Sequence, residues 1–222
     1  MTVFRIEVIS DITCPFCYVG KRKLEQAISL WNKAYRGNSD SFSITWRAYY
    51  LVPHAPPGEA TTVDYIKQKT GLDDITPVIM QLEQLGKANG IQFKLGGKTG
   101  STREAHRLIY LCQTKVSRAK IHDALVEGLF RAHHEGAQDI SSHIILRRIA
   151  EEAGIDAGDV DTWLKSDIGG TDVDREFSEA THKGIFGVPI FIIQGQYILR
   201  GAQDAPNFIA VFSKARDAAA AK

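Results

Sequence analysis

The sequence lacks the features that mark several other classes of protein. Lysine and arginine number 27 against 26 aspartate and glutamate residues, so no basic surface for nucleic acid is indicated. No apolar run approaches the roughly 20 residues that a membrane-spanning helix needs. The first residues enter a strand pattern directly, without the charged and apolar regions of a signal peptide. We therefore expect a soluble, intracellular protein with no nucleic-acid or membrane partner.

Cysteine is also scarce, with three residues in a chain of 222. This number argues against a disulfide-rich secreted scaffold and fits a reducing compartment. Cys14 and Cys17 form a CxxC pair, but a zinc site would need two further ligands and no second CxxC exists. His133 and His134 are adjacent residues in a polar helical stretch, and we do not assign them as those ligands. We therefore expect no metal site, and Cys112 is most simply a buried small apolar residue.

The CxxC pair stands where a predicted strand gives way to a predicted helix. Residues 3–9 are apolar and β-branched, which predicts a buried strand. Helical spacing after the motif is shown by Leu24, Ala27, Ile28 and Trp31. Cys14 then falls at the N-cap position, and Pro15 in the first turn, where its missing N–H costs nothing.

This position favours thiol chemistry at Cys14. Unpaired N–H groups and the positive end of the helix dipole stabilise an anion at a helix N-terminus, so we expect a stabilised Cys14 thiolate. Cys17 follows one turn later, close enough for a disulfide but directed inward. We expect Cys14 to be the exposed sulfur that forms mixed disulfides and Cys17 to resolve them. Two inert core cysteines are the alternative interpretation.

The rest of the chain is predicted to form a helical block between two β-containing ends. Residues 42–50 alternate with period two, which predicts a strand parallel to the first, and residues 51–58 predict a linker. The strong signals in residues 62–173 are helical, and they include a capping-box pattern at Ser101–Glu104. Residues 187–199 predict a hairpin that turns at Gly195, followed by a last helix.

Pro189 occupies an unusual position in this hairpin. It lies near the start of a strand that otherwise looks central, although proline has no N–H to donate. One arrangement is a cis Val188–Pro189 bond that leaves backbone polar groups open at a sheet edge. The alternative is a trans proline at an ordinary strand start. The cysteine pair favours the first arrangement, because a thiol site needs an edge where a substrate chain can dock.

Taken together, these features resemble a known family. A strand, the motif Cys14-Pro15-Phe16-Cys17, a helical insertion and Gly187-Val188-Pro189 before a hairpin are similar to a DsbA-type thioredoxin fold, over nearly the whole chain. Residues 11–20 (DITCPFCYVG), 104–108 (EAHRL), 187–189 (GVP) and 201–203 (GAQ) resemble the FrnE-like branch of that family.

The resemblance implies an α/β architecture and a cellular location. The expected fold is a discontinuous thioredoxin-like domain (β-α-β … β-β-α) of residues 1–61 and 174–222. A large all-helical insertion domain, residues 62–173, would interrupt it, as in DsbA. The FrnE-like branch implies a cytoplasmic oxidoreductase.

The resemblance also implies the roles of individual residues. Cys14 matches the nucleophile, Cys17 the resolving cysteine, and Pro189 the cis-proline that faces them, preceded by Val188. His106 matches a histidine on an insertion helix that borders the substrate groove, and a solvated helix histidine is the alternative.

Pro15 and Phe16 would contact substrate between the two cysteines. Phe16 is a departure from periplasmic DsbA, which has a histidine between its cysteines that stabilises the thiolate. Strong oxidising power is therefore not implied for this chain.

The function we predict is that of a thiol–disulfide oxidoreductase acting on protein or small-molecule thiols and disulfides. No bound cofactor is expected, glutathione is a candidate co-substrate, and a homodimer is compatible with the sequence. The alternative is a glutathione-dependent isomerase or transferase, similar to 2-hydroxychromene-2-carboxylate isomerase and kappa-class glutathione transferase. Those enzymes typically carry serine at the position of Cys14 and lack the second cysteine. A third interpretation is a non-enzymatic adaptor whose CxxC pair only supports the fold.

Overall fold

The two ends of the chain meet in one sheet. The computed structural model describes residues 1–37, 39–53, 60–116 and 119–220. The sheet has four strands in the order β2-β1-β5-β6. The strands are β1 (Val3–Ser10), β2 (Ser41–Ala48), β5 (Ile190–Ile193) and β6 (Tyr197–Arg200). β1 and β2 are parallel, whereas β5 is antiparallel to β1 and β6 to β5, so the predicted β-α-β and β-β-α units are confirmed.

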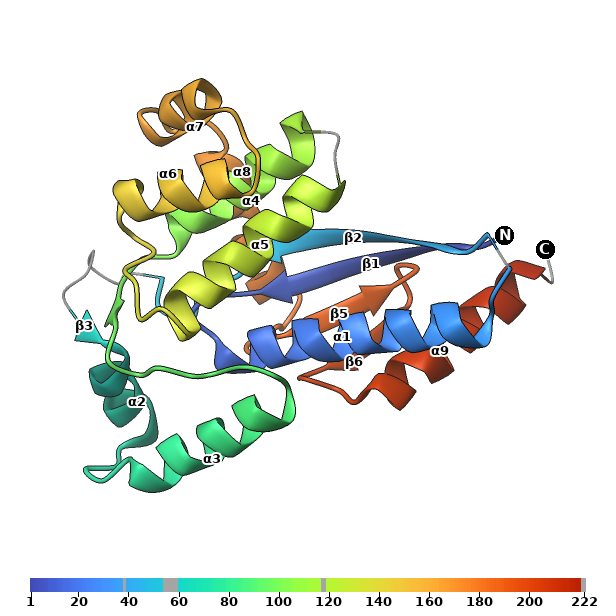
Figure 1. The fold of residues 1–222 in the computed structure, drawn as a ribbon, viewed down its shortest axis with the longest axis horizontal. Helices are drawn as coiled ribbons and strands as arrows, with labels where there is room; N and C mark the ends of the chain where they lie inside the picture. Colours follow the sequence, from blue (N-terminus) through green and yellow to red (C-terminus); the bar gives the residue numbers. More distant parts are fainter. Residues whose placement is uncertain (38, 54–59, 117–118, 221–222) are drawn as a thin grey trace.

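Helices cover both faces of this sheet and extend beyond it. They are α1 (Pro15–Ala34), α2 (Thr62–Thr70), α3 (Thr76–Ala88), α4 (Arg103–Lys115), α5 (Ala119–His134), α6 (His143–Glu152), α7 (Ala157–Leu164), α8 (Gly170–His182) and α9 (Ala205–Ala220). We call α4–α8 the bundle and α2–α3 the arm. Figure 1 shows the bundle and the arm on opposite sides of the start of α1. No helix in the described part of the chain is long and apolar enough to cross a membrane.

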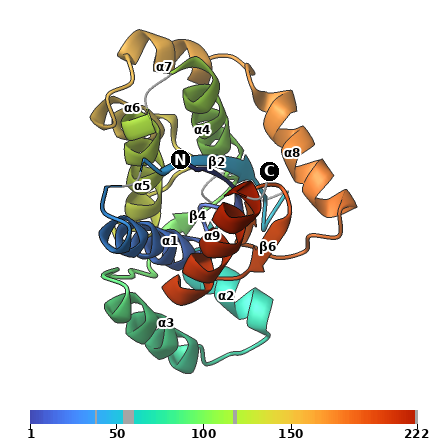
Figure 2. The same ribbon diagram turned by 90° about the vertical axis from the view of Figure 1, so that its right-hand side faces the viewer.

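Alternating side chains of β1 give the sheet two packed faces. Phe4 is fully buried, and its ring lies 5.3 Å from that of Trp31 in α1 and 5.2 Å from that of Phe212 in α9. Ile9 points to the other face and packs with Ala180 of α8. Figure 2 shows α1 and α9 side by side beneath the sheet. The period of two along β1 thus places helices from both ends of the chain against one sheet.

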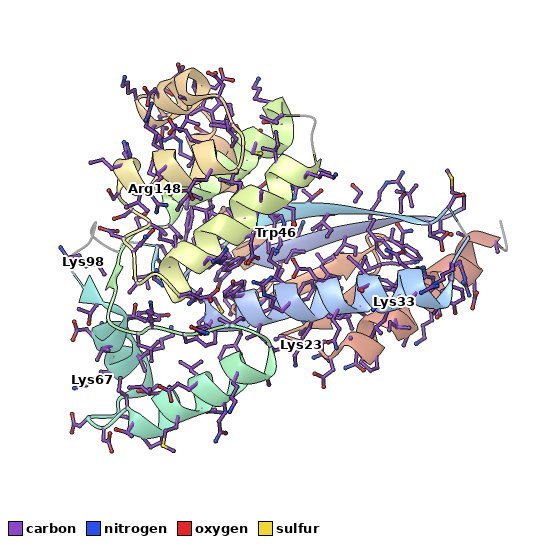
Figure 3. The ribbon with its side chains drawn as sticks, in the orientation of Figure 1. Lys23, Lys33, Trp46, Lys67, Lys98 and Arg148 are labelled. Carbon is purple, nitrogen blue, oxygen red and sulfur yellow. The ribbon has the colours of Figure 1, made fainter. Side chains whose placement is uncertain are left out.

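The bundle is tied closely to the sheet and to α1. Trp46 of β2 is 5% exposed, and its ring lies 6.0 Å from that of Phe130 in α5. Figure 3 shows Trp46 in the space between β2 and α5. On the neighbouring side, the buried ammonium of Lys21 in α1 lies 2.9 Å from the carboxylate of Glu127 in α5. Apolar and ionic contacts therefore fix α5 over the start of α1.

The hairpin turn was predicted correctly. Gln194 and Gly195 both have positive φ, 54° and 69°, between β5 and β6. This pair of left-handed residues matches the twist of the flanking strands, and glycine adopts it without steric cost.

The helical block differs from the prediction in two details. Residues Lys98–Thr99 form a short strand, β4, that pairs antiparallel with β3 (Ala60–Thr61). The helix α8 runs without interruption through the expected boundary at residues 173 and 174. Most of the predicted linker, residues 54–59, lies outside the described residues. The division into a domain of residues 1–61 and 174–222 and a domain of residues 62–173 stays a prediction.

The capping box predicted at Ser101–Glu104 was wrong. The helix α4 begins after Thr102, whose side chain makes no capping hydrogen bond. Its hydroxyl is instead engaged by the carboxylate of Asp11, far away in the sequence. A reciprocal capping box does form at the start of α2, between Thr61 and Asp64.

Candidate active site

The CxxC pair lies at the N-terminus of α1, as the sequence predicts. Cys14 is the N-cap residue, with extended backbone angles, and Pro15 opens the first turn. The N–H of Cys14 donates to the C=O of Asp11 at 3.1 Å, and the N–H of Cys17 donates to the C=O of Cys14 at 3.0 Å. The two cysteines lie 3.5 Å apart and are not bonded to each other. The strand-to-helix turn therefore brings both thiols together in reduced form.

The two thiols have unequal surroundings, although the expectation of an exposed Cys14 was wrong. Cys14 is only 5% exposed and Cys17 only 1%. Cys14 lies on the wall of a groove, whereas Cys17 faces the interior and does not line that groove. Burial, together with the neighbouring Cys14, raises the pKa of the Cys17 thiol well above its ordinary value. Cys17 thus keeps its proton while Cys14 is the sulfur that a ligand can reach.

The segment before β5 lies directly against Cys14. The Val188–Pro189 peptide bond is cis. The Sγ of Cys14 is 3.7 Å from the carbonyl oxygen of Val188. Within the described residues, no other backbone group pairs with the N–H or C=O of Val188. The C=O of Val188 therefore accepts from the Cys14 thiol, and its N–H has no backbone partner within the described residues.

Gly20 explains why α1 can lie so close to this segment. A Cβ atom added at Gly20 would meet the Phe191 ring at 3.0 Å and the Pro189 ring at 3.1 Å. Only a residue without a side chain allows this approach without displacing one of the two rings.

A groove of about 330 Å³ opens over Cys14. Its floor comes from the CxxC loop and the Val188 segment, and includes Pro15 and the half-exposed Phe16. Its far wall comes from the arm, chiefly Tyr65, Ile66, Val78, Leu82 and Leu85. Burial, with the nearby Asp11 and Cys14, raises the pKa of Tyr65 to about 12, so its hydroxyl keeps its proton.

Comparison with known proteins agrees with this geometry. The sequence pattern of the DSBA-like thioredoxin domain matches residues 5–212. The chain belongs to this family. The expected DsbA-like thioredoxin fold with a helical insertion is thereby confirmed.

Individual relatives cover nearly all of the chain. The uncharacterized protein YwbO of Bacillus subtilis is 28% identical over 206 residues, which is 91% of this chain and 92% of YwbO. The crystal structure of the probable DsbA oxidoreductase SCO1869 from Streptomyces coelicolor is 26% identical. It matches 96% of this chain and 90% of its own, with a TM-score of 0.83. A structure of 2-hydroxychromene-2-carboxylate isomerase, 14% identical, shares the fold with a TM-score of 0.65 and covers 98% of this chain and 99% of its own.

Behind the groove of this family member lies a buried carboxylate, Asp11, that is 1% exposed. It accepts a hydrogen bond from the N–H of Leu51 at 2.7 Å and interacts with the hydroxyl of Thr102. Burial acts to raise the pKa of Asp11, but interactions with His106, Leu51 and Thr102 outweigh it and lower the pKa. The charged side chain thus joins the CxxC loop to the segment that follows β2 and to the start of α4.

His106 does not line the groove. It is 4% exposed, its Nε2 lies 3.6 Å from Oδ1 of Asp11, and its ring faces that of Tyr50. The alternative of a solvated helix histidine is also excluded by this burial. His106 therefore lies behind the groove, next to Asp11.

The sequence analysis missed His134, which does line the groove. His134 is 4% exposed, and its Nε2 lies 2.9 Å from the C=O of Ile12. Burial and the neighbouring His133 hold the pKa of His134 well below its ordinary value, so the imidazole is neutral. Its spacing of four residues from Phe130 was the available signal, because both lie on the inner face of α5. The two adjacent histidines of the predicted polar helical stretch are therefore both buried.

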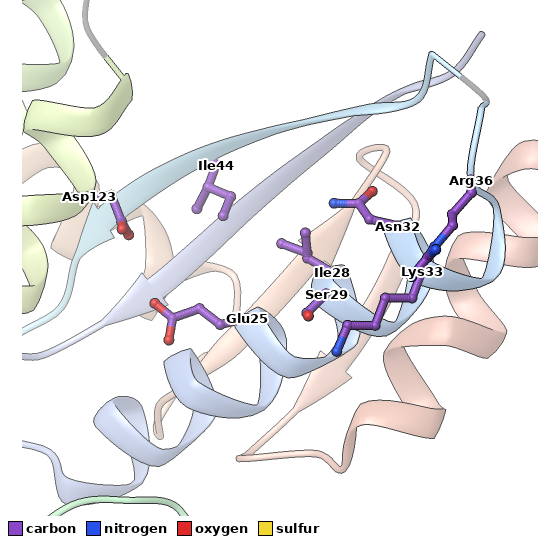
Figure 4. A pocket seen from close by; sticks show the side chains of 8 residues that line it. All are labelled: Glu25, Ile28, Ser29, Asn32, Lys33, Arg36, Ile44 and Asp123. Carbon is purple, nitrogen blue, oxygen red and sulfur yellow. The ribbon is translucent and has the colours of Figure 1, made fainter.

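A second hollow, of about 550 Å³, lies beside α1 and faces α5 and β2 (Figure 4). Its lining carries both signs of charge, from Glu25, Asp123, Lys33 and Arg36, and includes no cysteine or histidine. The described residues also contain no cluster of three or more groups arranged to hold a metal ion. The CxxC pair therefore borders the groove over Cys14 and not this second hollow.

Proposed function

We propose that this protein is a thiol–disulfide oxidoreductase whose redox centre is the Cys14–Cys17 pair. The observation that carries the proposal is the unequal pair itself: a reachable sulfur at a helix N-terminus, 3.5 Å from a buried thiol that keeps its proton. The positive end of the α1 dipole lies at Cys14 and favours negative charge there over the interior position of Cys17. This arrangement separates the attacking sulfur from the resolving sulfur.

In the reducing direction, the Cys14 thiolate attacks one sulfur of a substrate disulfide. The substrate S–S bond breaks, a Cys14–substrate disulfide forms, and the first substrate thiolate leaves and takes up a proton. Cys17 then loses its proton and attacks the sulfur of Cys14, which releases the second substrate thiol. Two electrons have passed to the substrate, and a Cys14–Cys17 disulfide remains. The oxidising direction is the reverse, and the redox poise of the compartment sets which one operates.

The backbone of Val188 supports docking of a substrate chain. Its N–H has no backbone partner within the described residues and its C=O faces Cys14, so this segment can pair with an extended chain as a strand edge does. Protein or small-molecule disulfides, with glutathione as co-substrate, are the substrates we propose. The FrnE-like branch, the cytoplasmic location and a homodimer stay predictions from the sequence.

The first test is a titration of the protein across a series of glutathione redox buffers, with thiols labelled and counted by mass. We expect a reversible two-electron transition of Cys14–Cys17, and a mixed disulfide trapped on Cys14 when Cys17 is replaced by alanine. Cys112→Ser is the matched control and should leave the transition unchanged, because Cys112 is buried away from the groove.

The same experiment distinguishes the oxidoreductase from the alternative, a glutathione-dependent isomerase or transferase. A pair that never forms a disulfide, in a protein that binds glutathione without a covalent bond, would reject the oxidoreductase. An isomerase or transferase would then take its place, and its activity would survive Cys17→Ala because such a reaction needs no resolving thiol.

A further inference from the structure

Ser10 is a buried polar residue that has no role in the exchange proposed for the two cysteines. It is the last residue of β1 and is 2% exposed. Its backbone C=O accepts from the N–H of Tyr49. Its side-chain oxygen, by contrast, is buried and has no hydrogen-bond partner among the described residues of the reduced protein. A buried hydroxyl without a partner costs stability, so its presence needs a reason.

Alternation along β1 directs Ser10 toward the CxxC helix. Phe4 and Val8 belong to the same core as Cys17, whereas Ile9 packs in a separate core on the other face of the sheet. Because successive side chains of a strand point to opposite faces, Ser10 lies on the face of Phe4 and Val8. The helix α1 covers this face, and its residue Cys17 is only 1% exposed. The unpaired hydroxyl therefore lies on the same side of the sheet as the buried thiol.

The hydroxyl acts on the Cys17 thiol together with the backbone of the next residue. Burial is the largest influence on the pKa of Cys17 and raises it, as does the neighbouring Cys14. The side chain of Ser10 and the backbone of Asp11 act in the opposite direction and favour the charged form. Both supply a donor, an O–H and an N–H, and a thiolate accepts hydrogen bonds more strongly than a thiol does. The two donors therefore gain their full acceptor only when Cys17 loses its proton.

We propose that Ser10 is a catalytic residue of the resolving step, in which its hydroxyl donates a hydrogen bond to the forming thiolate of Cys17. This thiolate attacks the Sγ of Cys14, the bond from Cys14 to the substrate sulfur breaks, and the Cys14–Cys17 disulfide forms. The departing substrate thiolate takes up the proton that Cys17 has lost. In the oxidising direction Cys17 is the leaving thiolate, and the same hydroxyl stabilises it. The proposal rests on the proposed function, because it assigns a further residue to the same exchange.

The role of Ser10 is specific to one of the two chemical steps. A donor that is unpaired beside the thiol and paired beside the thiolate stabilises the charge that develops during resolution, and it thereby lowers the barrier of that step. Attack by Cys14 on the substrate places no charge on Cys17. The first step should therefore proceed without Ser10, whereas the second should depend on it.

The test measures both steps in one recording. A symmetrical aromatic disulfide with a coloured thiolate product is mixed in equal amount with the reduced protein, in a Cys112→Ser background so that the product reports on the pair. Attack by Cys14 releases the first equivalent of coloured thiolate, and resolution by Cys17 releases the second. We expect Ser10→Ala to slow the second phase at least about tenfold and to leave the first phase within about twofold, as for the loss of a hydrogen bond to a charged group.

Matched variants separate the hydroxyl from its packing. Ser10→Thr keeps an O–H, and Ser10→Val has nearly the same shape without one. The second phase should therefore be at least about tenfold faster in Ser10→Thr than in Ser10→Val, even if the added methyl group slows both. Thr2→Ala is the control outside the site, because Thr2 is 8% exposed and precedes the opposite end of β1. Both of its phases should equal those of the Cys112→Ser parent.

The outcomes separate the role of Ser10 from the proposed function. Equal slowing of both phases in Ser10→Ala would show a structural role, and an unchanged second phase would show no role. Either result, or equal second phases in Ser10→Thr and Ser10→Val, would overturn the proposal and retain the oxidoreductase. A parent protein that releases the first equivalent and never the second would instead reject the proposed function, and the role of Ser10 with it.

Discussion

The arm and the bundle both come from the helical block that the sequence predicts, but they are stabilised differently. The bundle buries its side chains, as Leu108, Leu129 and Leu146 are fully inaccessible. It also buries the guanidinium of Arg107, which donates to the carbonyls of Trp163 at 2.7 Å and Ile168 at 3.0 Å. In the arm, by contrast, most apolar side chains keep part of their surface open over Cys14. The same helical periodicity thus forms a core in one region and a ligand-facing wall in the other.

The largest difference between the two regions should be the effect of acid on their stability. The bundle holds three buried neutral histidines, whereas residues 62–88 of the arm contain no histidine. Burial lowers the pKa of His122 and of His133 to about 4 and that of His134 well below its ordinary value. In the unfolded chain each would bind a proton below about pH 6.5. Their contribution to stability is therefore complete above pH 6.5 and is lost as the pH falls toward 4.

The expected loss can be measured by urea unfolding at a series of pH values. Each histidine should remove up to about 1.4 kcal/mol of unfolding free energy per pH unit within this window. A His122→Gln variant should show a shallower slope than the wild type. A wild-type curve that is flat between pH 6.5 and 4.5 would show that these side chains are protonated in the folded protein.

Truncation of a core isoleucine of the bundle should give the next largest loss of unfolding free energy. Ile149 is 3% exposed, and its side chain fills the space that a Cβ at Gly128 would occupy. Ile149→Ala removes buried methyl groups and leaves a cavity, so we expect a loss of about 2–5 kcal/mol in unfolding free energy. Chemical denaturation at neutral pH measures this value. A loss below about 1 kcal/mol would mean that the bundle is packed no better than the arm.

The matched isoleucine of the arm should give the smallest effect on stability. Ile66 is only partly buried and lines the groove. Ile66→Ala creates no closed cavity, so we expect a loss of less than about 1 kcal/mol in the same denaturation experiment. A loss as large as that of Ile149→Ala would show that the arm belongs to the cooperative core, and the contrast between the two regions would fail.

Local signals explain why much of the fold could be predicted from the sequence. The first strand, the helix after Pro15 and the turn at Gln194–Gly195 each depend on neighbouring residues, through alternation, capping and positive φ. The candidate pair Cys14 and Cys17 was found for the same reason, because a strand, two cysteines and a helix follow one another within the chain.

The incorrect predictions have a different origin, since each concerns a contact between residues that are distant in the sequence. The capping pattern at Ser101–Glu104 was misleading because Asp11 engages the hydroxyl of Thr102. Likewise, His133 and His134 stand in a stretch that the sequence indicates as polar and helical, yet both are buried, and His134 contacts the C=O of Ile12 just before the CxxC motif. Periodicity indicates which face of a helix is apolar, but it does not say what lies against that face.

The sequence by itself determined the candidate reactive group of this protein, since the position of a CxxC pair at a helix N-terminus depends on neighbouring residues alone. The sequence also predicted that Cys14, and not Cys17, faces outward, but only the tertiary structure decided how deeply Cys14 is buried and what lies over it. Cys14 meets Val188 across 174 residues of sequence and lies beneath the arm. Burial and groove lining arise from packing between segments that are remote in the chain, and local sequence patterns do not encode how such segments meet.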